Sequence, residues 1–407
     1  MVKRKRIVCF TASYPFGNRE TYFDLELKYL SKEFEEIIIV PRYNPYNFSE
    51  KREVPINVVV LDPIVPQGME RIIRGVFNLN PIWLFIEDFF SKRVFFDKRR
   101  IKKWLNSLLV YRITVSYFKK HVVKVIDNNT VLYSYWAEAP LFTSNLVNGF
   151  KKIVRMHGGD FYLNRNNGYL PLRKQIYDSS DLLLPISKDI ARILKADYGT
   201  DYSKIFINYL GVERQCVMKH NKPNQNTQKI VLVSCSNVIP LKRVHLIVDA
   251  LMLYRNGLKI DWHHFGDGTE LQFVKERAKL LGDNISVTFH GWTEPQRIME
   301  FYKQNYVSWF INVSIYEGIP VSIMEAFSFG IPSIATDVGG TSEIVNEKNG
   351  YLLPSNFDSA TLLDRILSCD TDKKGYSCLR GGAYQTWENN FDASMNYSKL
   401  VYRIEQL

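Results

Sequence analysis

Short apolar runs alternate with amphipathic segments along most of this chain. Runs of about four to eight apolar residues bounded by turn residues favour buried strands, whereas apolar residues at helical spacing favour helices. The pattern predicts strands over 5–10, 36–42, 58–63, 130–136, 152–157, 181–187, 229–236, 259–266, 285–291, 307–312 and 331–336. It predicts helices over 22–34, 69–126, from 188 onward, and over 244–254, 270–282, 321–329 and 387–407.

The alternation of strand and helix predicts parallel sheets of the α/β class. Because 407 residues exceed one ordinary core and the alternation restarts near residue 230, we expect two Rossmann-like, doubly wound domains. The N-terminal domain is predicted over 1–212, a polar linker over 213–229 and the C-terminal domain over 230–386. The final helix, 387–407, is expected to pack back toward the N-terminal domain.

Positive charge is concentrated in the first half of the chain. Residues 1–200 carry 32 Lys and Arg against 20 Asp and Glu, whereas residues 201–407 carry 21 against 22. Segment 92–124 holds eleven basic residues and one acid, Asp97, interleaved with aromatic and aliphatic residues. This composition favours an anionic membrane surface as partner. A solvated basic helix pair stays an alternative, and nothing else in the chain resembles a nucleic-acid-binding domain.

The N-terminus and the cysteines indicate a cytoplasmic protein. The start MVKRKRIVCF has no long apolar run and is interpreted as a first strand, and no stretch of the sequence is apolar enough for a transmembrane helix. The five cysteines form no C-x-x-C pair, which favours reduced thiols. We expect a cytoplasmic protein that lies peripherally on the inner face of the membrane.

The segment 314–345 carries the clearest candidate chemistry. Glu317-Gly318-Ile319-Pro320 predicts a tight turn after a buried strand, followed by a helix that contains Glu325. A helix N-terminus beside a glycine turn favours a diphosphate. The two carboxylates would repel that diphosphate, so sugar hydroxyls are their natural partners. On spacing alone, an ordinary amphipathic helix with solvated acids and turn glycines is the favoured explanation.

The same segment resembles the signature of the retaining glycosyltransferases of family 4, in which two glutamates stand eight positions apart. The resemblance continues along the chain. It covers Phe16-Gly17-Asn18 with Glu20, Arg155–Asp160, Leu210-Gly211-Val212, Ser236–Arg243, Phe265–Gly268 and His290-Gly291-Trp292. It implies a GT-B fold, in which two Rossmann-like domains face each other across a cleft.

The resemblance also implies roles for individual residues. Catalytic roles fall to His157, near the sugar, and to Glu317, on the hydroxyls of the donor sugar. Donor and nucleotide binding falls to Gly17, Lys242, Arg243, Gly266, Trp292, Thr293, Gly318, Ile319, Pro320 and Glu325. Within this set Glu325 would hold the ribose, and Lys242 would neutralise the diphosphate.

One departure from the family pattern concerns phosphate binding. Asn237 stands where the family usually has Arg, so either Arg243 substitutes for it or the diphosphate is held less tightly. The family acts without a metal ion and with no cofactor besides the nucleotide-sugar co-substrate. The string Asp370-Thr371-Asp372 has the D-x-D form of a metal site, but its polar, Lys-flanked context argues against one.

The leading hypothesis is a hexosyltransferase of polysaccharide biosynthesis. It would move a hexose or N-acetylhexosamine from a UDP-sugar, or secondly a GDP-sugar, to a membrane-associated, lipid-linked glycan acceptor. Two alternatives are a GT-B epimerase, which needs no acceptor, and a non-catalytic membrane-bound scaffold with a degenerate sugar site. A phosphorylase would need a pyridoxal lysine that the sequence does not identify.

Overall fold

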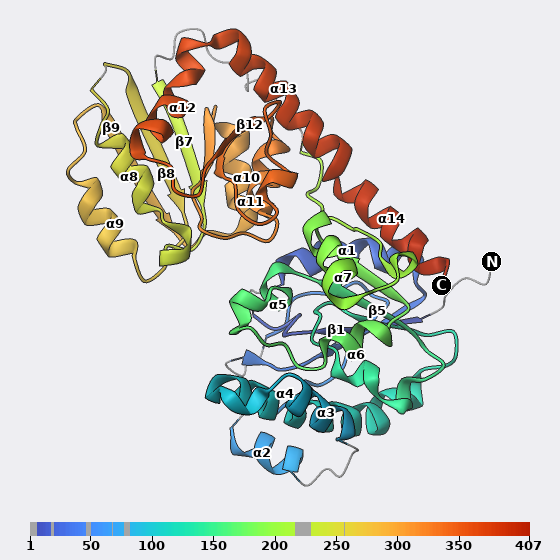
Figure 1. Cartoon of the computed structure of the whole chain (residues 1–407). Helices are drawn as coiled ribbons and strands as arrows, with labels where there is room; N and C mark the ends of the chain where they lie inside the picture. The colour runs from blue at the N-terminus through green and yellow to red at the C-terminus, as the bar shows by residue number, and fades with distance from the viewer. Residues whose placement is uncertain are drawn as a thin grey trace. The chain divides into compact units, whose positions relative to one another are not determined.

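The computed structural model describes residues 6–17, 20–45, 50–66, 68–76, 82–215, 229–255 and 257–407. The chain divides into two units (Figure 1). The N-terminal unit comprises Met1–Tyr209 and Ser394–Leu407, and the C-terminal unit comprises Leu210–Ala393. Most of the linker predicted over 213–229 lies outside the described residues.

The N-terminal unit is built on a six-stranded parallel sheet of order β3-β2-β1-β4-β5-β6. Its strands are β1 (Arg6–Thr11), β2 (Glu36–Pro41), β3 (Val58–Val60), β4 (Val131–Ser134), β5 (Lys151–Met156) and β6 (Leu182–Pro185). The central positions of β1, β2, β4 and β6 are apolar and buried, as expected for strands covered on both faces, whereas the edge strand β3 exposes Val59. The order reverses at β1, whose neighbours are β2 and β4.

The helices of this unit are α1 (Thr21–Glu33), α2 (Met69–Val76), α3 (Trp83–Ser91), α4 (Lys98–Tyr117), α5 (Gly158–Phe161), α6 (Arg173–Asp178), α7 (Lys188–Tyr198) and α14 (Ala393–Glu405). The one-turn helix η2 (Val94–Phe96) precedes α4, whose first turn is capped by Asp97. In Figure 1, α2 lies beside α4 at the end of the unit farthest from α14. The helix predicted over 69–126 is therefore several helices.

A fully buried ion pair joins α1 to the sheet of this unit, and an asparagine beside it extends the network to the last helix. Arg155 on β5 pairs with Glu26 on α1 at 3.0 Å, and both side chains are 0% exposed. Arg155 also donates to the side chain of Asn208, which in turn donates to the carbonyl of Asn396 on α14. The final residues of the chain are thus held by hydrogen bonds within the N-terminal unit.

The C-terminal unit has a second six-stranded parallel sheet, of order β12-β11-β10-β7-β8-β9. Its strands are β7 (Lys229–Cys235), β8 (Lys259–Phe265), β9 (Ile285–Gly291), β10 (Trp309–Asn312), β11 (Ser333–Thr336) and β12 (Gly350–Leu353). Its helices are α8 (His245–Leu251), α9 (Leu271–Ala278), α10 (Pro295–Gln304), α11 (Val321–Phe327), α12 (Ser359–Thr371) and α13 (Lys373–Asn390).

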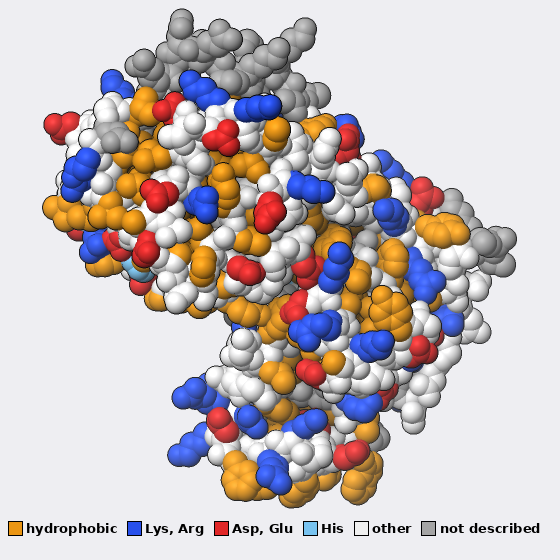
Figure 2. Space-filling view, turned by 45° about the horizontal axis from the view of Figure 1, so that its top comes forward, with side chains coloured by type: hydrophobic (Ala, Val, Ile, Leu, Met, Phe, Trp, Pro, Cys, Tyr) orange, Lys and Arg blue, Asp and Glu red, His pale blue; other side chains and the backbone are white. Residues whose placement is uncertain are grey.

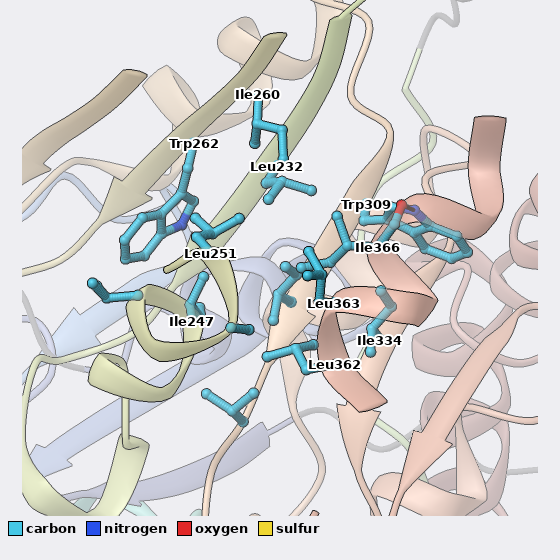
Figure 3. Packing of buried hydrophobic residues seen from close by; sticks show 14 of the residues in the cluster. Leu232, Ile247, Leu251, Ile260, Trp262, Trp309, Ile334, Leu362, Leu363 and Ile366 are labelled. Carbon is cyan, nitrogen blue, oxygen red and sulfur yellow. Dashed lines mark hydrogen bonds between the residues drawn. The ribbon is translucent and has the colours of Figure 1, made fainter. Parts of the chain in front are cut away.

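The core of the C-terminal unit is apolar. Figure 3 shows side chains of α8 and α12 packing against the sheet, with Trp262 and Trp309 on separate strands. Both indoles are fully buried, and each indole N–H finds a partner, Ser234 for Trp262 and the Ile366 carbonyl for Trp309. This packing fixes the strand ends from which the site loops emerge.

The sequence pattern missed some elements. Strand β12 has only four residues and begins with Gly350, so it left no clear apolar run. The segment predicted as one helix over 387–407 is the end of α13, a break at Phe391-Asp392 and then α14. Among the described residues, no helix is both long and apolar enough to cross a membrane.

Candidate functional site

The candidate donor site of the C-terminal unit lies where the strand order reverses. Strand β7 lies between β10 and β8, so the loops after β7 and β10 leave the sheet at its switch point. In open α/β sheets this is where ligands bind. Lys242 lies on the loop after β7, and Glu317 lies on the loop after β10.

Glu317 and Lys242 contact each other directly. The Lys242 ammonium donates to Oε1 of Glu317 at 2.5 Å. The same oxygen accepts from the Asn312 amide at 3.1 Å and from the Ser314 hydroxyl at 2.7 Å. Among the described residues, Oε2 of Glu317 receives no hydrogen bond. The carboxylate is therefore fixed through one oxygen and keeps the other for a ligand.

Two glycines allow the loop after β11 to press against the Glu317 turn. A Cβ on Gly339 would lie 1.9 Å from the Glu317 carbonyl oxygen, and one on Gly340 would lie 2.2 Å from that of Gly318. The Gly340 N–H donates to the Gly318 carbonyl at 2.8 Å. Only glycine fits this approach, so the D-V-G-G turn buttresses the E-G-I-P turn.

Arg243 has a different environment from its neighbour Lys242. Its guanidinium donates to the carbonyls of Val313, Ser314 and Ser355 at 2.8, 3.3 and 2.7 Å. The residue has φ of 49°, in the left-handed region. Arg243 thus joins the loops that follow β7, β10 and β12. This differs from the expected contact with phosphate, which stays a prediction.

Glu325 lies on α11 without a hydrogen-bond partner for its carboxyl group among the described residues. Burial raises the pKa of this carboxyl to about 7. The charge of Glu325 in turn helps burial to raise the pKa of the Cys235 thiol to about 12, while Lys242 opposes that rise. Glu325 and Lys242 therefore both lie close to Cys235, at the carboxyl end of β7.

Pro320 and Ile319 have structural roles as well. Pro320 immediately precedes α11, where its missing N–H costs nothing, and Ile319 is 7% exposed. The turn therefore offers mainly the backbone of Gly318 and Ile319 to a ligand.

An aromatic surface lies at the ends of β8 and β9. The ring of Phe265 stacks on His290 at a centroid distance of 4.2 Å, and the Gly266 N–H donates to the Gly291 carbonyl at 2.8 Å. Gly266 has φ of 140°, and a Cβ there would lie 1.9 Å from the Ser236 carbonyl oxygen. Trp292 follows and is 58% exposed. An exposed indole on a fixed turn can stack on a flat ligand.

Thr293 is also predicted to bind the nucleotide. Its hydroxyl donates a hydrogen bond to the Gly291 carbonyl at 3.1 Å. This bond fixes the turn that presents Trp292. Its contact with a nucleobase stays a prediction.

The loop after β1 in the N-terminal unit is closed by its own carboxylate. Glu20 accepts from the backbone N–H groups of Ala12, Ser13 and Tyr14 at 2.9, 2.7 and 2.7 Å. The Trp136 indole donates to the same carboxylate at 2.6 Å. Gly17, with φ of 71°, allows the turn between these residues. These backbone donors are occupied by Glu20.

His157 is buried and engaged in the same unit. Its Nε2 lies 3.1 Å from the Tyr135 carbonyl, so this nitrogen carries the proton and donates. Burial, assisted by the charge of Arg155, lowers the pKa of His157 to about 3. The ring packs beside Trp136 at a centroid distance of 4.6 Å. His157 is therefore neutral at pH 7, and only Nδ1 can accept a proton or a hydrogen bond.

Several functional contacts had no sequence signal. Asn312 and Ser314 orient Glu317, yet each is one polar residue at a strand end.

Asp372, from the D-x-D string, caps α13 by accepting from the Gly375 N–H at 2.9 Å. No cluster of three or more metal-ligating side chains occurs among the described residues.

Known proteins resemble parts of this chain in sequence and the whole of it in fold. Residues 218–384 match the family model "Glycosyl transferases group 1". The poly(ribitol-phosphate) alpha-N-acetylglucosaminyltransferase of Staphylococcus aureus is 30% identical over 36% of this chain and 30% of its own length. The putative colanic acid biosynthesis glycosyltransferase WcaL of Escherichia coli is 26% identical over 59% of this chain and 60% of its own. The matches thus span between about a third and three fifths of these relatives.

A solved structure matches the chain over its whole length. The Anabaena protein HepE in complex with UDP superimposes with a TM-score of 0.66 at 15% identity, covering 99% of this chain and 100% of that one. At this identity the likeness establishes the fold alone. The chain therefore has the GT-B fold, and its residues 218–384 match the family model of the glycosyl transferases group 1.

Proposed function

We propose that this protein is a retaining hexosyltransferase that uses a nucleotide-diphosphate sugar and needs no metal ion. The donor carries a hexose or N-acetylhexosamine on UDP or, as second choice, on GDP. The acceptor is a membrane-associated, lipid-linked glycan, and the process is polysaccharide biosynthesis on the cytoplasmic face of the membrane.

The arrangement of Lys242, Glu317 and Glu325 carries the proposal. Two carboxylates with unused oxygens accept hydrogen bonds from hydroxyl groups, and one ammonium beside them neutralises a diphosphate. Lys242 then moves from Glu317 to the donor phosphates, while Asn312 and Ser314 keep their hydrogen bonds to Oε1 of Glu317. Glu325 accepts from the ribose hydroxyls, and Trp292 stacks on the base. The UDP bound to the Anabaena relative supports uridine as the first choice.

The reaction depends on the charge that develops on the leaving diphosphate. Lys242 and the backbone N–H groups of the Gly318 turn stabilise it without a metal ion. The diphosphate then accepts the proton of the attacking hydroxyl. His157, neutral and donating from Nε2 to a carbonyl, orients the acceptor side rather than acting as a strong base.

The membrane contact is proposed for the surface around η2. Phe90, Phe95 and Phe96 are 64%, 44% and 76% exposed, beside the exposed cations Lys92 and Arg93. Figure 2 shows hydrophobic and basic side chains together at the lower end of that view, over the α2–α4 region. Of the aromatic and aliphatic residues in 92–124, Leu108, Tyr111 and Phe118 are instead buried. The proposed membrane contact therefore covers residues 90–96 and does not extend over the whole of 92–124.

The first experiment titrates the full chain with UDP, GDP, ADP and CMP by calorimetry in the presence of EDTA. We expect one nucleoside diphosphate to bind, and Glu325→Ala to abolish binding. Glu347→Ala, which changes an exposed glutamate of the same unit, serves as the matched control. Equal loss in both variants, or no binding by any nucleotide, would contradict the proposed donor site.

A further inference from the structure

A groove in the N-terminal unit lies at the carboxyl edge of its sheet, between α2 and α4. It measures about 1060 Å³, as large as an ordinary small-molecule site. Its floor includes Arg42, which follows β2, and Glu138, which follows β4. The groove therefore opens on the edge of the parallel sheet at which ligands of α/β proteins bind.

Helix α2 is pinned to α4 along one side of this groove. A Cβ on Gly75 would lie 2.5 Å from Cδ2 of Leu109, so the helices approach closely there. The Arg112 guanidinium also donates to the last carbonyls of α2, those of Gly75 and Val76, both at 3.4 Å. The groove wall is thus a fixed part of the unit.

The charges that line the groove do not balance. Arg42, Arg71 and Lys102 face one acid, Glu138, whose carboxylate and carbonyl oxygens accept from Arg42. Burial would raise the pKa of Glu138, but Arg42, Arg173 and Lys103 outweigh it and lower the pKa to about 2. The one acid is therefore already surrounded by cations.

Two cations of the groove are left over, Lys102 and the guanidinium of Arg71. Among the described residues Arg71 makes no hydrogen bond and no ion pair. Burial, assisted by the nearby charge of Arg42, lowers the pKa of its guanidinium. Two guanidinium groups that repel each other beside an open groove form a site for a divalent or diester anion, because their planar donors match phosphate oxygens.

Apart from Tyr43 and Asn106, the remaining side chains that line the groove are aliphatic. Ile72 on α2 and Leu105 on α4 are 54% and 48% exposed, and Val65, Pro66 and Leu109 continue the wall. Exposed aliphatic side chains on two facing helices disfavour a sugar or a free anion as the complete ligand. They fit a hydrocarbon chain that leads away from the anionic group.

We propose that this groove binds an anionic amphiphile, with a phosphate or diphosphate on Arg42 and Arg71 and a hydrocarbon chain along Ile72 and Leu105. The proposal rests on the proposed function and locates the lipid-phosphate part of the acceptor. It assigns Arg71 as a specificity-determining residue, which the sequence comparison did not indicate. The membrane surface around η2 is separate from these residues.

The test measures binding of farnesyl phosphate, below its micelle concentration, to the full chain. We expect Arg71→Ala to weaken binding by at least about tenfold, since it removes charge-assisted hydrogen bonds. Arg74→Ala is the matched control, because Arg74 lies on the same helix but pairs with Glu70 and does not line the groove. We expect Leu105→Ser to weaken binding as well, and Arg74→Ala to change it less than twofold.

Three further measurements separate the ligand sources. Inorganic phosphate that binds as tightly as farnesyl phosphate would overturn the amphiphile, and farnesol that binds as tightly would overturn the anion site. Flotation with anionic vesicles that is lost in Arg71→Ala, while farnesyl phosphate still binds, would assign Arg71 to the bilayer surface and overturn the groove.

Nucleotide calorimetry on the same variants keeps the two proposals apart. Farnesyl phosphate binding without any nucleotide binding would support the groove and contradict the proposed function. Nucleotide binding without farnesyl phosphate binding would contradict the groove alone.

Discussion

The loops at the two switch points use glutamate in opposite ways. After β1, the Glu20 carboxylate accepts three backbone N–H groups and the Trp136 indole, so its hydrogen-bonding capacity serves the fold. Near the switch point of the C-terminal unit, Glu317 on the loop after β10 keeps one oxygen unused, and Glu325 on α11 has no partner for its carboxyl group among the described residues. A satisfied carboxylate stabilises a loop, whereas an unsatisfied one costs folding free energy until a ligand binds.

The difference between these glutamates predicts that some contribute to the stability of the fold and others to ligand binding. Substitutions at Glu20 should act on the free energy of unfolding of the N-terminal unit, and substitutions at Glu325 should act on donor affinity. The three predictions below test this separation.

The largest expected effect is that of Glu20→Ala. It leaves several backbone donors and an indole N–H without an acceptor, so we expect the free energy of unfolding of the N-terminal unit to fall by about 3 kcal/mol. Urea denaturation followed by hydrogen exchange of β1 and β4 measures it. Nucleotide affinity should stay within about twofold.

The control for that measurement is Glu35→Ala, which removes an exposed glutamate after α1. We expect a change below about 0.5 kcal/mol. A similar loss in both variants would show that Glu20 contributes no more than a surface charge.

The second prediction contrasts neighbouring cations. Lys242→Met should weaken binding of the nucleoside diphosphate by about thirtyfold, or about 2 kcal/mol, and change stability little. Arg243→Met should lower the free energy of unfolding of the C-terminal unit by about 2 kcal/mol, because three carbonyls lose their donor. Calorimetry and urea denaturation of both variants check the pair.

If Arg243→Met instead weakened nucleotide binding at unchanged stability, Arg243 would replace the phosphate contact missing at Asn237. That outcome would restore the role expected from the sequence and reverse the assignment made from its contacts.

The sequence predicted the sheets better than the contacts at their edges. Apolar runs identify eleven of the strands because most of these parallel strands are buried on both faces, and short β12 left no such run. The turn 317–320 was identifiable because glycine permits backbone angles that other residues avoid and proline fixes φ. The partners of Arg243 and Glu20 were not, because they are carbonyls and N–H groups that every residue carries. Only the folded chain determines which of them a side chain meets.

The smallest expected effect concerns the proton on Glu325. Because burial raises its pKa to about 7, half of the free protein carries a neutral carboxyl at that pH. Ribose hydroxyls bind the carboxylate, so donor affinity should rise about tenfold between pH 6 and pH 8 and level off above. This affinity should be measured with an intact nucleotide sugar, since its diphosphate has no proton that titrates in this pH range. Glu325→Gln should bind weakly with little dependence on pH.

The same proton has the opposite effect on stability. A carboxyl whose pKa is higher in the folded than in the unfolded chain stabilises the fold while protonated, and that stability is lost as the pH rises through about 7. The free energy of unfolding of the wild type relative to Glu325→Gln should therefore fall between about pH 4.5 and pH 7, while donor affinity rises. If both quantities were flat with pH, Glu325 would be ionised throughout, and the contrast with Glu20 would rest on hydrogen bonds alone.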